Sequence, residues 1–195
     1  GVEHTDISVH CHNDLGMAVA NSLACVKAGA TQIECTVNGI GERAGSCPLE
    51  PLVMSLQCLY GQDTGIKYDE LLGLSHEVAA RSGKPVPPTK AIVGNRLFGW
   101  ETGLPTGYWL KSREMNPLIM MPYHFSMTGQ PAPHIYIGKK SGAANVTLVN
   151  ERLGLAQIED KDKVKELLHK VKELSIQVKR DLTDEEYTNL YYEVV

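Results

Sequence analysis

The first 83 residues predict an α/β fold in which helices cover parallel strands. Two strand patterns, at residues 7–13 and 31–37, alternate with helical patterns at residues 15–28 and 48–60. Period-two strand patterns and apolar residues at helical spacing are the primary signals for these elements. Short links between alternating strands and helices indicate parallel pairing, because each strand returns to the sheet through a helix.

Taken in order, the first strand pattern ends in the run HCHND at residues 10–14 and leads into a helix. The apolar positions that repeat at helical spacing are Leu15, Ala18, Val19, Leu23 and Val26. Gly29 follows this helix as a C-cap. The second strand pattern runs into a glycine-rich loop at residues 38–45, and a third helix is expected over residues 68–81, ending at Gly83.

The chain after residue 83 predicts a mostly helical, loop-rich region. Residues 84–89, KPVPPT, form a linker because proline prevents helix formation there. Residues 90–142 are irregular and rich in Gly, Pro, Trp, Tyr and Met, and a charged helix is expected near residues 160–180. Residues 183–186, TDEE, form a capping box that begins a last helix. The chain therefore divides into residues 1–83, a linker subdomain at 84–142 and a helical C-terminal subdomain at 143–195.

Composition excludes several classes of protein. The 195 residues are 43% hydrophobic and 22% charged, with a formal net charge of −4, as in globular proteins. The sequence has no block of basic residues, so nucleic acid and membrane surfaces are not expected partners. No apolar run approaches the roughly 20 residues of a membrane span, and no signal peptide is recognisable. Five cysteines without a CxxC pair indicate reduced thiols, and we expect a cytoplasmic protein.

His10 and His12 are candidate ligands of a divalent metal ion. Residues two apart on a strand point to the same face, so the two imidazoles lie side by side at the strand end. Imidazole nitrogen binds many divalent metals, but two ligands do not complete a site. The alternative is a structural histidine pair. Asp14 is expected either to cap the next helix or to support the metal ligands.

The loop at residues 38–45 is a second candidate site. Its glycines permit close approach of a ligand to the backbone, and Glu42 and Arg43 offer an acid and a guanidinium. The alternative is a tight turn with a surface ion pair. Because the loop follows the next parallel strand, it is expected beside the histidines. The run GKKSG at residues 138–142 could meet a phosphate or carboxylate, or be a solvated turn.

Residues 10–45, HCHNDLGMAVANSLACVKAGATQIECTVNGIGERAG, resemble the metal-binding half of the isopropylmalate synthase and homocitrate synthase family. The resemblance continues at residues 84–95 and returns at residues 138–142. This family belongs to a superfamily of metal-dependent condensing enzymes and lyases that includes hydroxymethylglutaryl-CoA lyase. The resemblance implies the C-terminal portion of a (β/α)₈ TIM barrel, its last two βα units, followed by a mostly helical linker subdomain.

The resemblance also implies an activity, a Claisen-type condensation of acetyl-CoA with a 2-oxo acid by a transferase of amino-acid biosynthesis. Its metal would be Zn, Mn, Mg or Co, and the enzyme would be a homodimer. Residue by residue, the family pattern implies metal ligands at His10 and His12. Catalytic roles fall on Glu42, Arg43 and Glu101. Cofactor contacts fall on Gly39, Gly41 and Lys139.

Three departures from the family pattern bear on this function. The family's first-strand segment, with an acidic metal ligand and an arginine, has no counterpart, so we expect only part of the active site here. Ser46 replaces an asparagine that adds a metal contact in many members. Trp100 and Pro105 replace two histidines of the linker, whereas Glu101 and Gly103 are kept. Two alternatives remain, a lyase or aldolase of the hydroxymethylglutaryl-CoA lyase type and a non-catalytic half-site subunit or fragment.

Overall fold

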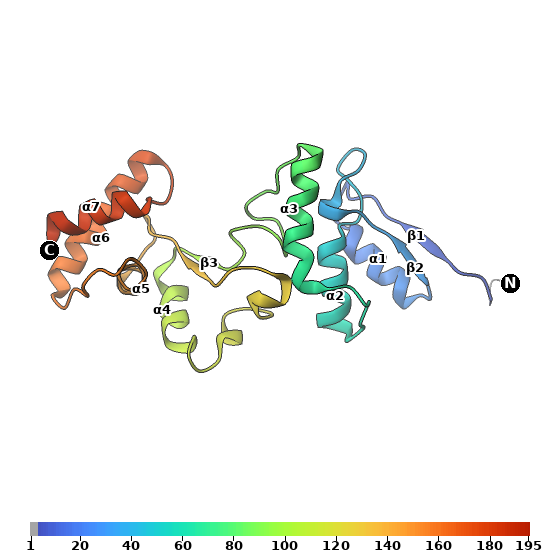
Figure 1. Cartoon of the computed structure of the whole chain (residues 1–195), viewed down its shortest axis with the longest axis horizontal. Coiled ribbons are helices and arrows are strands. Elements are labelled where there is room, and N and C mark those ends of the chain that lie inside the picture. Colours follow the sequence, from blue (N-terminus) through green and yellow to red (C-terminus); the bar gives the residue numbers. More distant parts are fainter. Residues whose placement is uncertain (1–3) are drawn as a thin grey trace. The chain divides into compact units, whose positions relative to one another are not determined.

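The computed structural model describes residues 4–195, which divide into two compact units (Figure 1). The first unit consists of the chain up to Leu97 together with Phe125–Pro131. The second unit consists of Phe98–His124 and Ala132–Val195. No helix in the described part of the chain is long and apolar enough to cross a membrane.

The first unit contains the α/β arrangement that the sequence predicts. Strand β1 (Ser8–His10) pairs in parallel with β2 (Gln32–Glu34), and α1 (Ala18–Lys27) connects them. Both strands are shorter than the sequence patterns that predicted them. The residues that follow each strand form hydrogen bonds with the segment after the glycine loop instead. The Cys11 carbonyl accepts the Cys47 N–H at 3.0 Å, for example. The α/β class is confirmed, and these strands are short.

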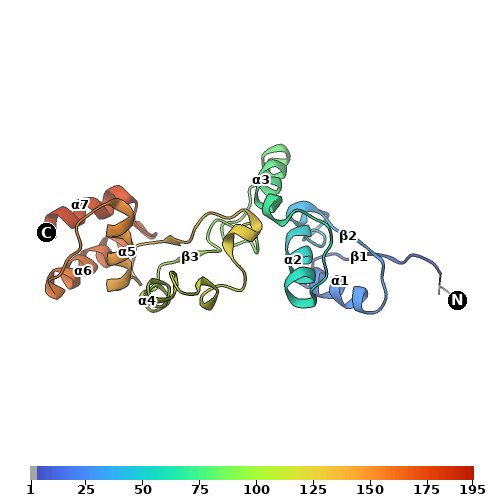
Figure 2. The ribbon, with the colours of Figure 1, turned by 60° about the horizontal axis from the view of Figure 1, so that its bottom comes forward.

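Helices α1 and α2 (Leu49–Tyr60) pack on the same face of this strand pair (Figures 1 and 2). The core between them consists of Ala18, Cys47, Leu52 and Leu56, with partly buried Cys11, Val19, Leu23, Val26, Ile33 and Cys35. Because strand side chains alternate, burying Ile33 on the helix side directs Glu34 to the other face. The polar face of the strands is therefore left open for the histidines.

The rest of the first unit holds the proline-rich segment beside the glycine loop. A short turn of helix, η2 (Tyr68–Glu70), leads into α3 (Leu71–Ser82), which ends at Gly83 as predicted. Gly83 adopts a left-handed conformation and stops the helix. Residues 84–97 then form a series of turns, in which Val93 is fully buried. We call residues 84–90 the proline strap.

The second unit is mainly helical, with a short parallel pair formed by β3 (Gly99–Trp100) and β4 (His134–Ile135). Its longer helices are α4 (Gly103–Ser112), α5 (Ala143–Leu153), α6 (Lys161–Val178) and α7 (Asp184–Val194). Its short 3₁₀ helix is η3 (Pro117–Ile119), whereas η4 (Phe125–Thr128) belongs to the first unit. Fully buried side chains of this unit include Val149, Leu167, Val171 and Tyr187.

Helix α4 lies in the region that was predicted to be irregular, and its glycines explain the difference. A Cβ on Gly103 would lie 2.9 Å from the Gly142 nitrogen, so Gly103 permits close packing of α4 on the start of α5. Pro105 sits in the first turn of α4, where proline costs no helical hydrogen bond. Gly103 and Pro105, which would interrupt a helix at many positions, are therefore compatible with α4.

The predicted capping box begins α7. The Thr183 hydroxyl accepts the Glu186 N–H at 3.2 Å, and the Glu186 carboxylate accepts the Thr183 N–H at 2.8 Å. Arg180 donates two further hydrogen bonds to Glu186, each 2.8 Å long. These bonds from Arg180 and then Thr183 lower the pKa of Glu186 from 4.5 to about 2.

Replacing Glu186 by glutamine is expected to lower the thermal unfolding midpoint at about pH 6 and to have little effect near pH 2. The folded-state pKa is depressed, so the ion pair stabilises the fold above pH 4.5 and loses this effect as the pH falls towards 2. Thermal unfolding followed by circular dichroism at several pH values measures this. Glu185→Gln, in the same helical turn, is the control and should change the midpoint less at every pH.

Candidate metal and substrate site

His10 and His12 lie together at the end of β1 with their Nε2 atoms facing each other. The two Nε2 atoms are 3.2 Å apart, and the ring centroids are 4.8 Å apart. Two ligands about 2.1 Å from one ion, at angles of about 90–110°, would be separated by roughly 3.0–3.4 Å. The observed separation therefore suits two nitrogens that share one metal ion.

The opposite nitrogen of each ring faces a hydrogen-bond acceptor. His10 Nδ1 lies 3.1 Å from a Glu34 carboxylate oxygen, and His12 Nδ1 lies 3.3 Å from the Gly45 carbonyl oxygen. Both acceptors favour the tautomer that carries its proton on Nδ1, which leaves a lone pair on Nε2. Two facing lone pairs repel unless a proton or a metal ion lies between them. A carboxylate or carbonyl behind each imidazole is the usual support of metal-bound histidine.

Glu34 is the residue of this site that the sequence analysis missed. It lies directly opposite His10 in the register of the parallel pair. Its side chain also accepts a hydrogen bond from Ser8 at 3.4 Å. The alternation of the second strand pattern, with Ile33 on the apolar face, could have placed Glu34 on the histidine face. Its pairing with His10 needed the register as well.

His10 and His12 are the two candidate metal donors that the structure brings together at this strand end. Within residues 4–195, no group of three or more His, Cys, Asp or Glu side chains is arranged to hold a metal ion. Ser46 is buried, its N–H bonds to the Gly39 carbonyl, and its backbone forms an antiparallel bridge with His12. The chemistry of the imidazole pair fits a divalent transition metal.

The glycine loop lies beside His12, as its position after β2 predicts. Gly45 has a φ of +93°, and its carbonyl accepts bonds from both the His12 ring and the Asn13 N–H. A Cβ on Gly45 would lie 2.1 Å from the Gly39 carbonyl oxygen. A Cβ on Gly41 would lie 2.6 Å from the Ser46 hydroxyl oxygen. Gly39, Gly41 and Gly45 thus allow the loop to fold closely on itself next to the histidines.

Arg43 of the glycine loop forms an ion pair with Asp14, two residues after His12. Arg43 Nε and one terminal nitrogen each lie 3.0 Å from an Asp14 carboxylate oxygen. This pairing lowers the pKa of Asp14 and raises that of Arg43. The expectation that Asp14 could cap the following helix is wrong, because the Asn13 side-chain oxygen accepts the Ala18 N–H at 3.2 Å. Asp14 is then available to orient Arg43.

Two hollows border these groups within the first unit. One, of about 440 Å³, is lined by His12, Asp14, Leu15, Met17 and Asn21. The other, of about 230 Å³, lies between the glycine loop and the proline strap. The side chain of Glu42 is exposed, and its backbone carbonyl accepts the Gly45 N–H at 2.9 Å. The structure therefore brings His12, Asp14 and Arg43 to one edge of the strands.

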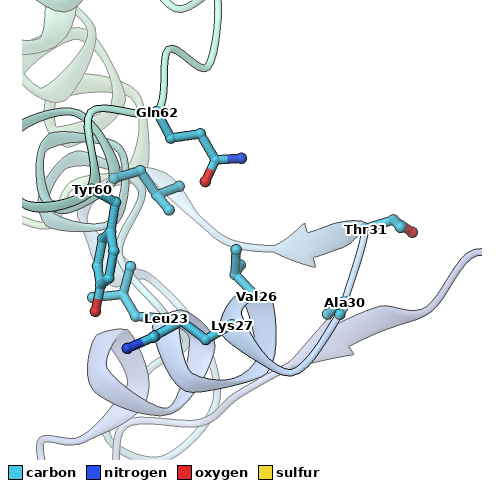
Figure 3. Close-up of a pocket in the computed structure, with 9 residues that line it drawn as sticks. Leu23, Val26, Lys27, Ala30, Thr31, Tyr60 and Gln62 are labelled. Carbon is cyan, nitrogen blue, oxygen red and sulfur yellow. The ribbon is translucent and has the colours of Figure 1, made fainter.

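A larger hollow, of about 600 Å³, lies at the other end of the same layer (Figure 3). Leu23, Val26 and Lys27 of α1 face Tyr60 and Gln62 at the end of α2. Thr31, just before β2, closes one side. Because β1 and β2 are parallel, this hollow lies at the strand starts and the histidines at the strand ends. It contains no residue of the predicted site.

Glu101 and Lys139 lie in the second unit, where both line the same hollow. Glu101 accepts the Lys140 N–H at 3.1 Å, and its backbone carbonyl accepts the Ser141 hydroxyl at 3.1 Å. Glu101, Lys139 and Arg180 are among the residues that line a hollow of about 320 Å³. Trp100 packs on Trp109, with ring centroids 5.2 Å apart, as core aromatics. The roles of Glu101 and Lys139 stay predictions.

The chain is similar to known proteins over nearly all of its length. Residues 2–78 match the family model described as HMGL-like. A 2-isopropylmalate synthase of Caldanaerobacter subterraneus subsp. tengcongensis is 41% identical over 193 residues, which are 97% of this chain and 48% of the relative. Homocitrate synthase 1 of Nostoc is 42% identical over 187 residues, covering 96% and 48%. A protein named as an (R)-citramalate synthase of Methanosarcina acetivorans is 39% identical over 178 residues, covering 91% and 35%.

The chain is therefore similar to the isopropylmalate and homocitrate synthases. It spans about half the length of the first two of these relatives. The family model covers the histidine strand, the glycine loop and Glu34 together. The matched residues thus include both imidazoles and the acceptor behind each ring.

Replacing Glu34 by glutamine is expected to weaken binding of Zn²⁺ by about 10–100-fold. The amide is a weaker acceptor for the His10 Nδ1 proton, so the imidazole becomes less basic and less well oriented. Calorimetric titration with Zn²⁺ measures the affinity. Gln32→Ala, two residues earlier on β2, serves as the control. Equal affinities of Glu34→Gln and the unchanged protein would contradict a role for this carboxylate behind His10.

Proposed function

We propose that this chain carries part of the active site of an enzyme that condenses acetyl-CoA with a 2-oxo acid. The reaction is a Claisen-type acyl transfer of the isopropylmalate, homocitrate or citramalate synthase type, in amino-acid biosynthesis. The observation that carries the proposal is the pair of imidazole Nε2 atoms 3.2 Å apart, with an acceptor behind each ring. The names of the relatives favour a synthase.

The first unit's own residues supply binding and orientation in this proposal. His10 and His12 hold a divalent ion, one of Zn, Mn, Mg or Co, while Glu34 and the Gly45 carbonyl orient the two rings. The bound ion would supply Lewis-acid polarisation of the substrate keto group.

Arg43 is proposed to bind the carboxylate of the 2-oxo acid. Asp14 holds two of its donors, and a guanidinium has five, so donors remain for a substrate. Fixing Arg43 through Asp14 limits the entropy lost when a carboxylate binds. Glu42, on the same loop, remains a candidate for proton transfer, and so does Glu101 in the second unit. The two loop glycines, Gly39 and Gly41, with Lys139 of the second unit, are proposed contacts of acetyl-CoA.

We further propose that the site is completed by residues outside this sequence. Residues 1–83 would form the last two βα units of a (β/α)₈ barrel, 84–142 a linker subdomain and 143–195 a helical subdomain. The remaining metal donors would come from the other barrel strands, in the same polypeptide or another chain. The working enzyme would be a cytoplasmic homodimer. His10 and His12 give only two donors, and no group of three or more metal-binding side chains occurs among the described residues, which supports this proposal.

The lyase alternative is tested by the same measurement as the synthase. The complete polypeptide in which this sequence occurs is incubated with acetyl-CoA, a divalent metal and a panel of 2-oxo acids, and free thiol is followed. Thiol release that depends on one 2-oxo acid, and that the His10→Ala/His12→Ala double variant lacks, is the expected result. Cleavage of a 3-hydroxyacyl-CoA with no turnover of any 2-oxo acid would assign a lyase instead. No turnover of either class, by protein that binds metal, would support a non-catalytic subunit.

A further inference from the structure

Asn38, the first residue of the glycine loop, is bonded through every polar group that it has. It has a φ of +60° and a ψ of +7°, the left-handed conformation. Its side-chain amide donates to the Ser75 carbonyl at 2.8 Å, and its side-chain oxygen accepts the Ser75 hydroxyl at 2.5 Å. Its backbone N–H donates to Glu50 at 2.7 Å, and its backbone carbonyl accepts the Lys90 ammonium at 2.9 Å.

These bonds come from elements that are far from Asn38 in the sequence. Glu50 is in the first turn of α2, Ser75 is in α3, and Lys90 ends the proline strap. Glu50 and Ser75 are completely buried. An asparagine tolerates the left-handed region, but holding it there costs free energy that these bonds offset. The bonds thus fix one backbone conformation at the start of the loop.

Glu50 and Lys90 bond to the two backbone groups of this residue, Glu50 as the acceptor and Lys90 as the donor. Burying a carboxylate is costly, and among the described residues one Glu50 oxygen has no hydrogen-bond partner. Its other oxygen is used for the Asn38 N–H. Lys90 is itself held in a tight turn, since a Cβ on Gly94 would lie 2.5 Å from the Lys90 carbonyl oxygen. The Lys90 side chain therefore comes from well-fixed backbone.

The fixed backbone of Asn38 leads directly to the acceptor behind His12. Gly39, the next residue, accepts the Ser46 N–H at 3.2 Å. The Cα of Gly45 packs against the same Gly39 carbonyl, leaving no room for a Cβ. The Gly45 carbonyl then accepts the proton of the His12 ring. A shift of Asn38 moves Gly39, and with it the carbonyl that orients His12.

We propose that Glu50, Ser75 and Lys90 are positioning residues for the metal site, acting on His12 through Asn38 and Gly45. Lys90 couples the proline strap to the loop, so a movement of the strap changes the orientation of the metal-binding imidazole. This inference rests on the metal site of the proposed function. It does not depend on which substrate the enzyme uses, because its consequences are visible with the metal ion alone.

The test compares Lys90 variants in the complete polypeptide, with Zn²⁺ as the only added ligand. Lys90→Met removes the donor and keeps the aliphatic stem, and Lys90→Arg keeps a donor. Lys90→Met should weaken Zn²⁺ binding by about 10-fold, and Lys90→Arg should restore most of it. Lys84→Met, in the same strap, should bind Zn²⁺ as the unchanged protein does. Glu50→Gln, which keeps an acceptor for Asn38, should bind more tightly than Glu50→Ala.

Amide hydrogen exchange provides a readout that needs neither metal nor turnover. Lys90→Met should speed exchange at Asn38, Gly39 and Ser46, while core amides of α1 and α2 keep their protection. Unchanged Zn²⁺ affinity and unchanged exchange in Lys90→Met would overturn the proposal. If the strap and loop respond as described but no 2-oxo acid is turned over, the proposed function fails and the positioning role stands.

Discussion

Replacing His12 by alanine is expected to lower the affinity of the protein for Zn²⁺ by more than about 100-fold. The change removes one of the two facing Nε2 atoms, so the remaining imidazole holds the ion alone. Loss of a supporting acceptor behind a metal ligand already costs about 10–100-fold, and loss of the ligand should cost more. Calorimetric titration with Zn²⁺ gives the affinity, and His10→Ala should behave in the same way.

A matched control separates this effect from a general loss of histidine. His76→Ala changes an exposed histidine of α3 in the same unit and should leave Zn²⁺ affinity unchanged. Thermal unfolding without metal should be similar in all three variants, because His10 and His12 are not core residues. If His12→Ala bound Zn²⁺ as tightly as His76→Ala, the imidazole pair would not be the metal site.

Replacing Gly45 by alanine should have the second large effect, on both stability and metal binding. The added Cβ would lie 2.1 Å from the Gly39 carbonyl oxygen, and the residue has a φ of +93°. Relieving this contact displaces the carbonyl that His12 and Asn13 share. The strain and the overpacking together should destabilise the fold by roughly 2–5 kcal/mol. Denaturant unfolding and Zn²⁺ titration measure the two effects.

Gly61→Ala isolates the conformational part of this effect. Gly61 ends α2 with a φ of +64°, and a Cβ there would meet no atom within 4 Å. Its replacement should therefore cost only about 1 kcal/mol and should not change Zn²⁺ affinity. Equal destabilisation by the two alanines, with intact metal binding in Gly45→Ala, would show that the loop does not hold His12 through this contact.

Local sequence patterns predicted those helices and strands whose formation depends mainly on residues close in the sequence. Alternation and helical spacing gave β1, α1, β2 and α2 in the right order, because each buries one regular face on the same core. The box of Thr183 and Glu186 predicted the start of α7 for the same local reason. Helix α4 was missed because its glycines and Pro105 discourage a helix locally, while packing on α5 favours one.

The candidate site shows where sequence patterns stop being informative. The pair of histidines follows from strand alternation, and its nearness to the glycine loop follows from parallel topology. Glu34 was missed because its pairing with His10 depends on the register of β1 and β2. The bonds of Asn38 join residues 12, 37 and 52 positions away in the sequence, so they follow from tertiary packing. Asp14 pairs with Arg43, and the Ala18 N–H at the start of α1 bonds to Asn13 instead.

We propose that His10 and His12 bind one metal ion through their Nε2 atoms, while Glu34 and the Gly45 carbonyl accept their Nδ1 protons. Two-bond proton–nitrogen correlation spectra of the histidine side chains, recorded as Zn²⁺ is added, test it directly. Both Nε2 resonances should move to metal-bound positions at one equivalent of Zn²⁺, and both Nδ1 atoms should stay protonated. Binding through Nδ1 of either ring, or no change at either Nε2, would contradict it.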